Sequence, residues 1–311
     1  MAQASRLATD VALGGDSSSS SSSSSSTIPR LVYGTAWKRD QTADLVYAAL
    51  RAGFRGIDTA AQPKHYDERG AGEGVRRAVA EGIVKRQHLF IQTKFTAPDG
   101  QNHMAPYDLD APLVEKVHQS VQSSLKNFTM DDGQEPFLDS VVLHSPLDTI
   151  QDTMTVWETL ESYAPRTIRN LGISNATLPI VEALHSRAAR PPAVVQNRFH
   201  ARTGYEGPLR AFCRDRGVVF QSFWTITANG RLVQGEPVVR VARGAGVEPV
   251  AAYYALVLGL GNVAILDGTT DERHMKEDLE GVEKVGLWAE GEGAADWEAA
   301  LGSFKTMIGD A

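Results

Sequence analysis

Val141-Val142-Leu143, between Ser140 and His144, is an unbroken apolar run that ends at a polar side chain. A strand buried on both faces has this pattern, and such strands belong to parallel sheets that helices cover. Seven more short runs have the same character: Leu31–Gly34, Gly56–Asp58, Leu89–Lys94, Thr167–Ser174, Ala193–Asn197, Val218–Ser222 and Val263–Leu266. The sequence therefore predicts eight buried strands.

Longer stretches with helical patterns separate these runs. They are Gln41–Ala52, Gly70–Glu81, Leu113–Phe128, Thr149–Tyr163, Leu178–Ser186, Pro208–Arg216 and Val250–Leu258, with Asp271–Leu279 after the last run. Strands that alternate with helices indicate βαβ units and a parallel sheet. No glycine-rich dinucleotide fingerprint follows the first strand, so the pattern favours a closed barrel over a doubly wound sheet. The predicted fold class is α/β, a (β/α)8 TIM barrel, with one domain over residues 28–311.

Composition limits the function classes. The 311 residues are 42% apolar and 22% charged, with a net charge of −7 and one cysteine, Cys213, which we expect in the core. The chain shows no basic face for nucleic acid, no run of 18 apolar residues for a membrane span and no signal-peptide pattern. We expect a cytoplasmic protein with no nucleic-acid or membrane partner and no obligate protein partner.

The N-terminal region differs from the rest of the chain. Residues 17–26 are an unbroken serine run. Such a segment has no apolar side chains to bury, so residues 1–27 are predicted to form a disordered tail.

Polar side chains stand where six of the eight apolar runs end. They are Asp58, Lys94, His144, Ser174 with Asn175, Gln196 with Asn197, and Ser222. The active site of a (β/α)8 barrel lies at the C-terminal ends of its strands. Each residue alone has a structural explanation, such as capping the next helix, but six on one rim favour a functional site.

These groups permit acid–base chemistry. Lys94 and Asp58, on neighbouring strand ends, are candidates for a buried ion pair, in which removal of either partner would leave an uncompensated charge. A tyrosine beside the lysine is expected to have a pKa below the usual value of about 10, because the ammonium favours the phenolate. A neutral His144 could donate a hydrogen bond to a substrate carbonyl.

A catalytic metal is the competing interpretation of His, Asp and Lys in a barrel. Metal-dependent enzymes of this fold need several His or carboxylate ligands, such as His-x-His after the first strand. The first strand here continues into Thr35-Ala36-Trp37, which offers no ligand. No metal site is therefore predicted.

Five ordered motifs resemble the aldo-keto reductase family between about residues 30 and 280. They are Gly53-Phe54-Arg55-Gly56-Ile57-Asp58-Thr59-Ala60 at the second strand, Phe90-Ile91-Gln92-Thr93-Lys94 at the third, Leu143-His144-Ser145-Pro146 at the fourth, Leu171-Gly172-Ile173-Ser174-Asn175 at the fifth and Val195-Gln196-Asn197 at the sixth. The resemblance implies that NADP(H) binds across the barrel rim, with NAD(H) as the alternative cofactor, and that hydride passes from the nicotinamide to a carbonyl carbon.

The resemblance also implies roles for individual residues. Tyr66 would protonate the alkoxide, Lys94 would assist it, Asp58 would hold Lys94, and His144 would orient the carbonyl. The implied cofactor-binding residues are Thr35, Ser174, Asn175, Gln196, Ser222, Gly268, Thr269, Thr270 and Arg273. The implied substrate pocket contains Trp37, His65 and Trp224.

Three positions depart from the family pattern. The family tyrosine usually follows the signature aspartate by five residues, where this chain has Pro63, so Tyr66 is assigned through a loop insertion and His65 is its weaker substitute. Gln221 stands where the family has a tyrosine that stacks on nicotinamide. Asp267 stands where the family often has a lysine for the 2′-phosphate, so the preference for NADP(H) rests on Arg273.

The sequence thus predicts an NADP-dependent oxidoreductase that reduces an aldehyde or ketone, with a small carbonyl compound as its partner. Two alternatives stay open. One is a non-catalytic nucleotide-binding barrel that acts as a sensor or interaction subunit. The other is a reductase of imines or activated alkenes.

Overall fold

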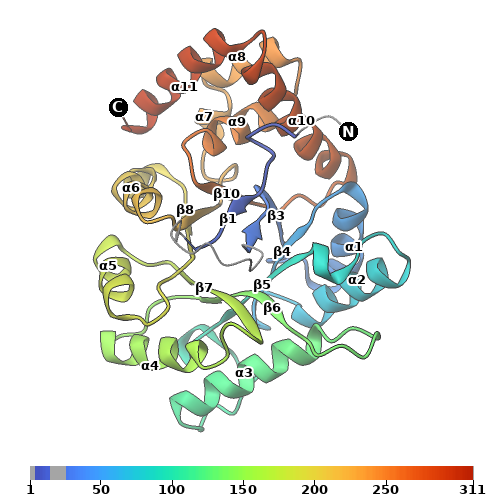
Figure 1. Cartoon of the computed structure of the whole chain (residues 1–311), viewed down its shortest axis with the longest axis vertical. Helices are drawn as coiled ribbons and strands as arrows, with labels where there is room; N and C mark the ends of the chain where they lie inside the picture. Colours follow the sequence, from blue (N-terminus) through green and yellow to red (C-terminus); the bar gives the residue numbers. More distant parts are fainter. Residues whose placement is uncertain (1–3, 15–25, 311) are drawn as a thin grey trace, which may run out of the picture. The chain divides into compact units, whose positions relative to one another are not determined.

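The computed structural model describes residues 4–14 and 26–310. Eight parallel strands form a closed barrel in the order β10-β3-β4-β5-β6-β7-β8-β9 (Figure 1). They are β3 (Leu31–Gly34), β4 (Gly56–Asp58), β5 (Phe90–Phe95), β6 (Leu138–Leu143), β7 (Ile168–Ser174), β8 (Val194–Arg198), β9 (Val219–Phe223) and β10 (Val263–Asp267). Each matches a predicted run to within a few residues, and the predicted fold class is confirmed.

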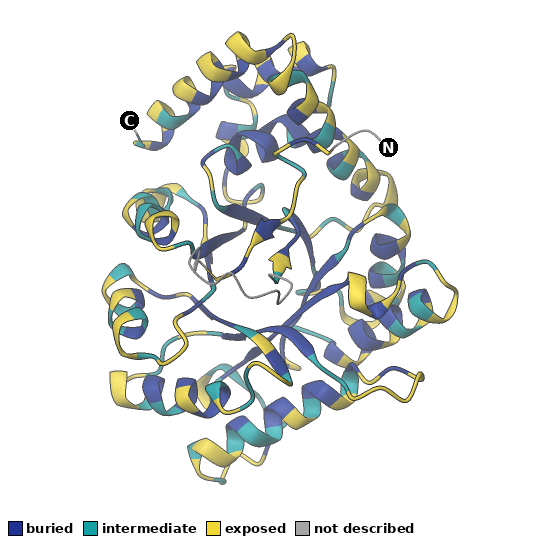
Figure 2. Ribbon diagram, in the orientation of Figure 1, coloured by how far each residue is buried: buried dark blue, intermediate teal, exposed yellow. Residues whose placement is uncertain are grey.

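The strands are apolar because they are buried along most of their length, as Figure 2 shows. The chain divides into two compact units. One is Val32–Gln196, and the other consists of Met1–Leu31 and Asn197–Ala311. No helix among the described residues has the length and apolar character needed to span a membrane.

The Val32–Gln196 unit holds the helices α1 (Thr42–Ala52), α2 (Glu68–Ala80), α3 (Leu113–Asn127), α4 (Ile150–Glu161) and α5 (Leu178–Arg187). Its strand register decides which polar residues meet. Asp58 pairs with Gln92 on β5, and Ser174 pairs with Gln196 on β8. Because side chains alternate along a strand, Gln92 and Lys94 point to the same side of the sheet.

The other unit holds α6 (Gly207–Asp215), α7 (Gly230–Val233), α8 (Glu236–Ala245), α9 (Pro249–Leu258), α10 (Glu272–Glu290) and α11 (Ala294–Ile308). Of these, α7, α8 and α11 were not among the predicted helices. Cys213 on α6 is fully buried, as expected of a core residue.

The expected disordered tail is wrong for its described part. Val11–Ala12 (β1) pairs antiparallel with Thr27–Ile28 (β2). The Ser5 amide and hydroxyl donate to the Glu283 carboxylate of α10 over 2.8–3.2 Å, and Ser5 is fully buried. The side chains of Val11 and Leu13 are also buried. Hydrogen bonds to a long helix and burial of apolar side chains therefore order this segment together. Residues 15–25, which carry most of the serine run, lie outside the described residues.

Candidate active site

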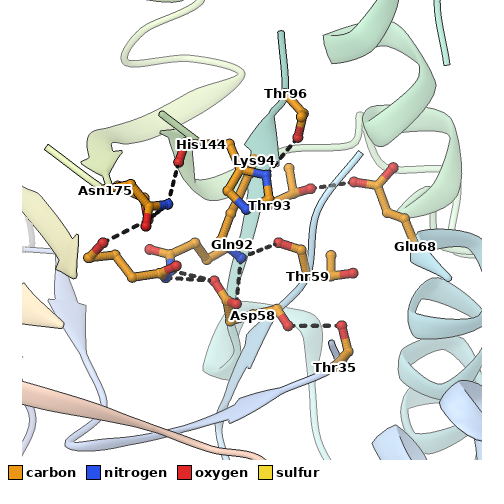
Figure 3. A network of polar contacts seen from close by, with 12 residues as sticks. Thr35, Asp58, Thr59, Glu68, Gln92, Thr93, Lys94, Thr96, His144 and Asn175 are labelled. Carbon is orange, nitrogen blue, oxygen red and sulfur yellow. Dashed lines mark hydrogen bonds and ion pairs between the residues drawn. The ribbon is translucent and has the colours of Figure 1, made fainter. Parts of the chain in front are cut away.

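A buried ion pair lies at the centre of the site. The Lys94 Nζ is 2.6 Å from Asp58 Oδ2 and also donates to the Thr59 carbonyl oxygen at 2.7 Å. The two charged side chains are only 1% and 2% exposed. The second Asp58 oxygen accepts from the Gln92 amide at 2.7 Å and from the Gln196 amide at 3.0 Å (Figure 3). Two amides and an ammonium thus replace the water that the carboxylate loses on burial.

Tyr66 lies against this ion pair. The Lys94 Nζ is 4.9 Å from the centre of the Tyr66 ring. Burial raises the pKa of the Tyr66 phenol, the Lys94 charge opposes this rise, and the Asp58 charge adds to it; the net pKa is raised. The expectation of a lowered pKa is therefore wrong, because burial of the phenol outweighs the ammonium. Tyr66 is protonated at neutral pH, as a proton donor must be.

The loop insertion that carries Tyr66 is a compact turn. The amides of His65 and Tyr66 both donate to the Gln62 carbonyl oxygen, at 3.1 and 3.0 Å. Asp67 then caps α2 by accepting from the Gly70 amide at 2.9 Å. Tyr66 lies three residues further along the chain than the tyrosine of the family pattern. Hydrogen bonds inside the loop hold the extra residues in a compact turn.

His144 directly follows β6, which pairs with the strand that carries Lys94. Its Nδ1 lies 2.7 Å from Thr96 Oγ1 (Figure 3). Its ring is 6.0 Å from the Tyr66 ring in an edge-on arrangement. Burial first, and then the positive charges of Lys94 and His65, lower the pKa of His144 to about 3. The imidazole is neutral at physiological pH, so its ring nitrogens can serve as one donor and one acceptor.

Ser174, at the end of β7, and Asn175, directly after it, join the same network. Ser174 Oγ donates to the Gln196 carbonyl oxygen at 2.7 Å, and Asn175 Nδ2 donates to the His144 carbonyl oxygen at 2.9 Å. Asn175 adopts a left-handed backbone with φ of 54° and is exposed, whereas Ser174 and Gln196 are buried. Gln196 belongs to the Asp58 network through its side-chain amide, a contact that the sequence analysis did not foresee.

The end of β3 supplies one buried and one exposed residue. Thr35 is fully buried and its hydroxyl donates to the Asp58 carbonyl oxygen at 3.0 Å. Trp37 is 62% exposed, has a φ of 65°, and its ring centre lies 4.1 Å from that of His65. An exposed aromatic ring beside the loop that carries Tyr66 is suited to contact a small organic molecule.

In the other unit, Ser222 Oγ lies 2.5 Å from Thr225 Oγ1. Trp224 is 52% exposed with a φ of 56°, and the Arg198 guanidinium lies 4.4 Å above its ring. Such stacking keeps both flat side chains extended at the surface.

The loop after β10 and the first turn of α10 contain the predicted phosphate contacts, which are Gly268, Thr269 and Thr270 in the loop and Arg273 in the helix. Asp267 is 1% exposed and accepts from the Thr269 amide at 3.0 Å. Asp271 caps α10 by accepting from the amides of Arg273 and His274, so these two amides already have a partner. The Arg273 side chain is 70% exposed. The Arg273 guanidinium is thus at the surface. The Asp267 carboxylate, which is expected to repel a phosphate, is buried.

Four polar residues near the ion pair were not predicted: Gln62, Glu68, Gln92 and Thr96. The fully buried Glu68 carboxylate accepts from Thr93 Oγ1, from Ser124 Oγ at 2.8 Å and from Asn127 Nδ2 at 2.9 Å. Burial raises the pKa of Glu68, and the three hydrogen bonds oppose that rise. Only Gln92 carried a sequence signal, since it precedes Lys94 by two residues on one strand.

Within the described residues, no group of three or more His, Cys, Asp or Glu side chains is arranged to hold a metal ion.

The comparisons with known proteins agree with this architecture. The protein is an α/β barrel in which the Lys94–Asp58 ion pair is buried at the ends of the strands. The sequence model of the aldo/keto reductase family matches residues 30–248. The chain therefore belongs to this family.

Curated relatives are moderately similar. The glyoxal reductase of Bacillus subtilis is 31% identical over 205 residues, which cover 65% of this chain and 64% of that protein. The NAD(P)H-dependent D-xylose reductase of Pachysolen tannophilus is 27% identical over 198 residues, 56% of each chain. The match therefore spans less than two thirds of these relatives.

Solved structures share the fold. An aldo/keto reductase from Brucella melitensis superposes with a TM-score of 0.71 at 19% identity, over 94% of this chain and 98% of that one. The aldo-keto reductase AKR2E4 of Bombyx mori, solved in complex with NADP, gives a TM-score of 0.69 at 20% identity, over 90% and 92%.

Proposed function

We propose that this protein is an NADP(H)-dependent oxidoreductase that reduces the carbonyl group of an aldehyde or ketone. The observation that carries the proposal is the group of Asp58, Tyr66, Lys94 and His144, in which a protonated phenol contacts a buried ammonium beside a neutral imidazole. The family membership and the NADP bound to one structural relative support it.

Each residue has a distinct role in the proposed reaction. NADPH supplies the hydride when it is bound. The Tyr66 hydroxyl donates its proton to the oxygen of the carbonyl as negative charge develops there. Lys94 stabilises the resulting phenolate, since an adjacent ammonium favours the charged form, and Asp58 holds Lys94 in place. His144 donates a hydrogen bond that orients the carbonyl.

The residues of the chain fit a nicotinamide dinucleotide. Ser174, Asn175 and Gln196 offer hydroxyl and amide groups that suit a carboxamide. Arg273 offers an exposed guanidinium for the 2′-phosphate. These contacts favour NADP(H) over NAD(H), and reduction is the expected direction with NADPH. Thr35, Ser222, Gly268, Thr269 and Thr270 remain predicted cofactor contacts, and Trp37, His65 and Trp224 remain predicted pocket residues.

The sensor alternative depended on the displaced tyrosine. The position of the Tyr66 ring, 4.9 Å from Lys94 Nζ despite the insertion, favours the enzyme over this alternative. Imine or alkene reduction stays an alternative, which an absence of turnover with every aldehyde and ketone tested below would favour. Cytoplasmic location stays a prediction.

The test replaces the proton donor. In Tyr66→Phe we expect kcat/KM for NADPH-dependent reduction of a panel of aldehydes and ketones to fall about 10²–10⁴-fold, the usual contribution of a positioned acid. NADPH binding, measured by quenching of tryptophan fluorescence, should be retained. Tyr47→Phe on α1, whose hydroxyl bonds Glu81 instead, is the matched control. Wild-type turnover in Tyr66→Phe would exclude Tyr66 as the acid.

A further inference from the structure

Thr96 and His144 are neighbours because each directly follows one of two paired strands. Phe95, the last residue of β5, pairs with Leu143, the last residue of β6. The His144 amide donates to the Phe95 carbonyl oxygen at 2.9 Å, which extends the pairing beyond the two strands. The Thr96 hydroxyl oxygen then lies 2.7 Å from His144 Nδ1 (Figure 3).

The loop after β5 holds Thr96 in this position. The Thr96 carbonyl oxygen accepts from the Tyr107 hydroxyl at 2.7 Å and from the Gln101 side-chain amide at 3.3 Å. Its methyl group lies against Gly100, where an added Cβ would be 2.7 Å from Thr96 Cγ2. Because the backbone and the methyl group are both held and the residue is only 4% exposed, the hydroxyl keeps its direction towards His144.

The direction of this hydrogen bond follows from the partners of the hydroxyl. Among the described residues, the Thr96 hydroxyl has one hydrogen-bond partner, which is His144 Nδ1. If Nδ1 carried a hydrogen and donated it, the buried hydroxyl hydrogen would be left without an acceptor. Buried donors without a partner are rarer in proteins than acceptors with an unused lone pair. The hydroxyl therefore donates, and Nδ1 accepts.

This direction determines which ring nitrogen of His144 carries a hydrogen. Burial first, and then the charges of Lys94 and His65, lower the pKa of His144 to about 3, so at neutral pH the ring holds one hydrogen. With Nδ1 as the acceptor, that hydrogen is on Nε2. No described residue bonds His144 Nε2, and the side chain is only partly buried. The Nε2 hydrogen is therefore available to a ligand.

We propose that Thr96 is a positioning residue for carbonyl reduction, which sets the tautomer of His144 in which Nε2 carries the hydrogen. Thr96 acts only through His144. The hydrogen bond from Nε2 to a substrate carbonyl rests on the proposed function, whereas the tautomer is a property of the protein without substrate. The two can therefore be measured separately.

Nitrogen-15 NMR measures the tautomer directly, because a ring nitrogen that carries a hydrogen and one that has a lone pair differ widely in chemical shift. We expect the wild-type protein at neutral pH to show the hydrogen on His144 Nε2, with the signals assigned by their loss in His144→Gln. Thr96→Val keeps the shape of the side chain but has no hydroxyl. Both tautomers should then be populated, so the two shifts should move towards each other.

The controls separate the hydroxyl from the shape of the residue. Thr96→Ser keeps the hydroxyl and should keep the wild-type shifts. Thr129→Val, at an exposed position after α3, removes a hydroxyl that bonds the Leu125 carbonyl oxygen and should leave the His144 shifts unchanged. In Thr96→Val, kcat/KM for aldehyde reduction should fall about tenfold, the effect of one weakened hydrogen bond, with the Kd for NADPH unchanged. Thr96→Ser should restore most of this loss.

The possible failures are distinguishable. A hydrogen on Nδ1 in the wild type, or equal His144 shifts in the wild type and Thr96→Val, would overturn the role of Thr96. If the shifts respond but kcat/KM does not, Thr96 sets the tautomer and its positioning role in the reaction is overturned. If the wild type reduces no aldehyde while the shifts respond as expected, the proposed function fails and the tautomer assignment stands.

Discussion

Three titratable side chains of the site respond to burial in different directions. Burial raises the pKa of the Tyr66 phenol and lowers that of the His144 imidazole to about 3. Burial also disfavours the charged Lys94, but Asp58 and Tyr66 offset this and the net pKa of Lys94 is raised. At neutral pH the site therefore holds a protonated phenol, a charged ammonium and a neutral imidazole. A carbonyl reductase that donates a proton needs this combination.

The low pKa of His144 predicts a pH dependence of stability. The unfolded histidine takes up a proton near pH 6.5, whereas the folded one resists protonation down to about pH 3. Its contribution to stability is complete above pH 6.5 and is lost as the pH falls from 6.5 towards 3. His144→Gln removes this loss, so its Tm should decline less than that of the wild type between pH 7 and pH 4, by on the order of 5 °C.

Thermal unfolding at several pH values measures this difference. His88→Gln, at an exposed position, is the control and should follow the wild-type curve. Parallel curves for the wild type and His144→Gln would contradict the assigned protonation state.

At the scale of elements, α2 connects the loop that carries Tyr66, the proposed acid, to the rest of the site. Glu68 is the first residue of α2, two residues after Tyr66, and its carboxylate is held by Thr93 of β5 and by Ser124 and Asn127 of α3. Thr93 adjoins Lys94 on the same strand. Glu68 therefore fixes the distance between the helix that follows the proposed acid and the strand that carries its ammonium partner.

Glu68→Gln tests this positioning role. The amide would turn a donor towards at least one of the three donors around it, which costs about 1–3 kcal/mol of folding free energy. We expect kcat for carbonyl reduction to fall about tenfold, because a small displacement of the acid weakens proton transfer, with the Kd for NADPH unchanged. Glu73→Gln on the exposed face of α2 is the matched control. A lower Tm with wild-type kcat and an unchanged pH profile would mean that Glu68 is only structural.

Sequence patterns predicted the strands well, because a buried strand must be apolar and its polar end residue stands out. They predicted the length of α10 poorly. The expected helix stopped at Leu279, but α10 continues to Glu290 through Gly281. A Cβ at Gly281 would lie 2.4 Å from the Ala251 Cβ, so this glycine allows close packing on α9 and does not end the helix.

The candidate site was predictable only in part, because contacts between separate elements leave no pattern along the sequence. Asp58, Lys94 and His144 were found because the ends of parallel strands share one rim. Glu68 and Thr96 acquire their meaning from partners on other elements, such as Asn127 and His144, and no spacing along the chain indicates such contacts. The pKa of Tyr66 was misjudged because the sequence showed the neighbouring charge but not the depth of burial.

At the scale of the whole chain, residues near the N-terminus pack on the last part of the fold. The amide and hydroxyl of Ser5 bind Glu283, and the Arg6 amide donates to Glu290 at 2.7 Å. A glycine makes this approach feasible, since a Cβ at Gly286 would lie 2.1 Å from Ser5 Oγ. The segment before the serine run is thus held by α10.

Paired glycine substitutions measure what this docking contributes. Gly286→Ala should displace Ser5, break its hydrogen bonds to Glu283 and lower the Tm, by about 2–4 °C for each kcal/mol lost. Gly302→Ala on α11 has open space at its Cβ and should instead raise the Tm, because alanine favours a helix by about 0.5–1 kcal/mol. Limited proteolysis should cleave residues 4–14 faster in Gly286→Ala than in the wild type or in Gly302→Ala. Equal Tm shifts and equal cleavage in the two variants would show that the docked segment does not contribute to stability, and that helix propensity alone governs both sites.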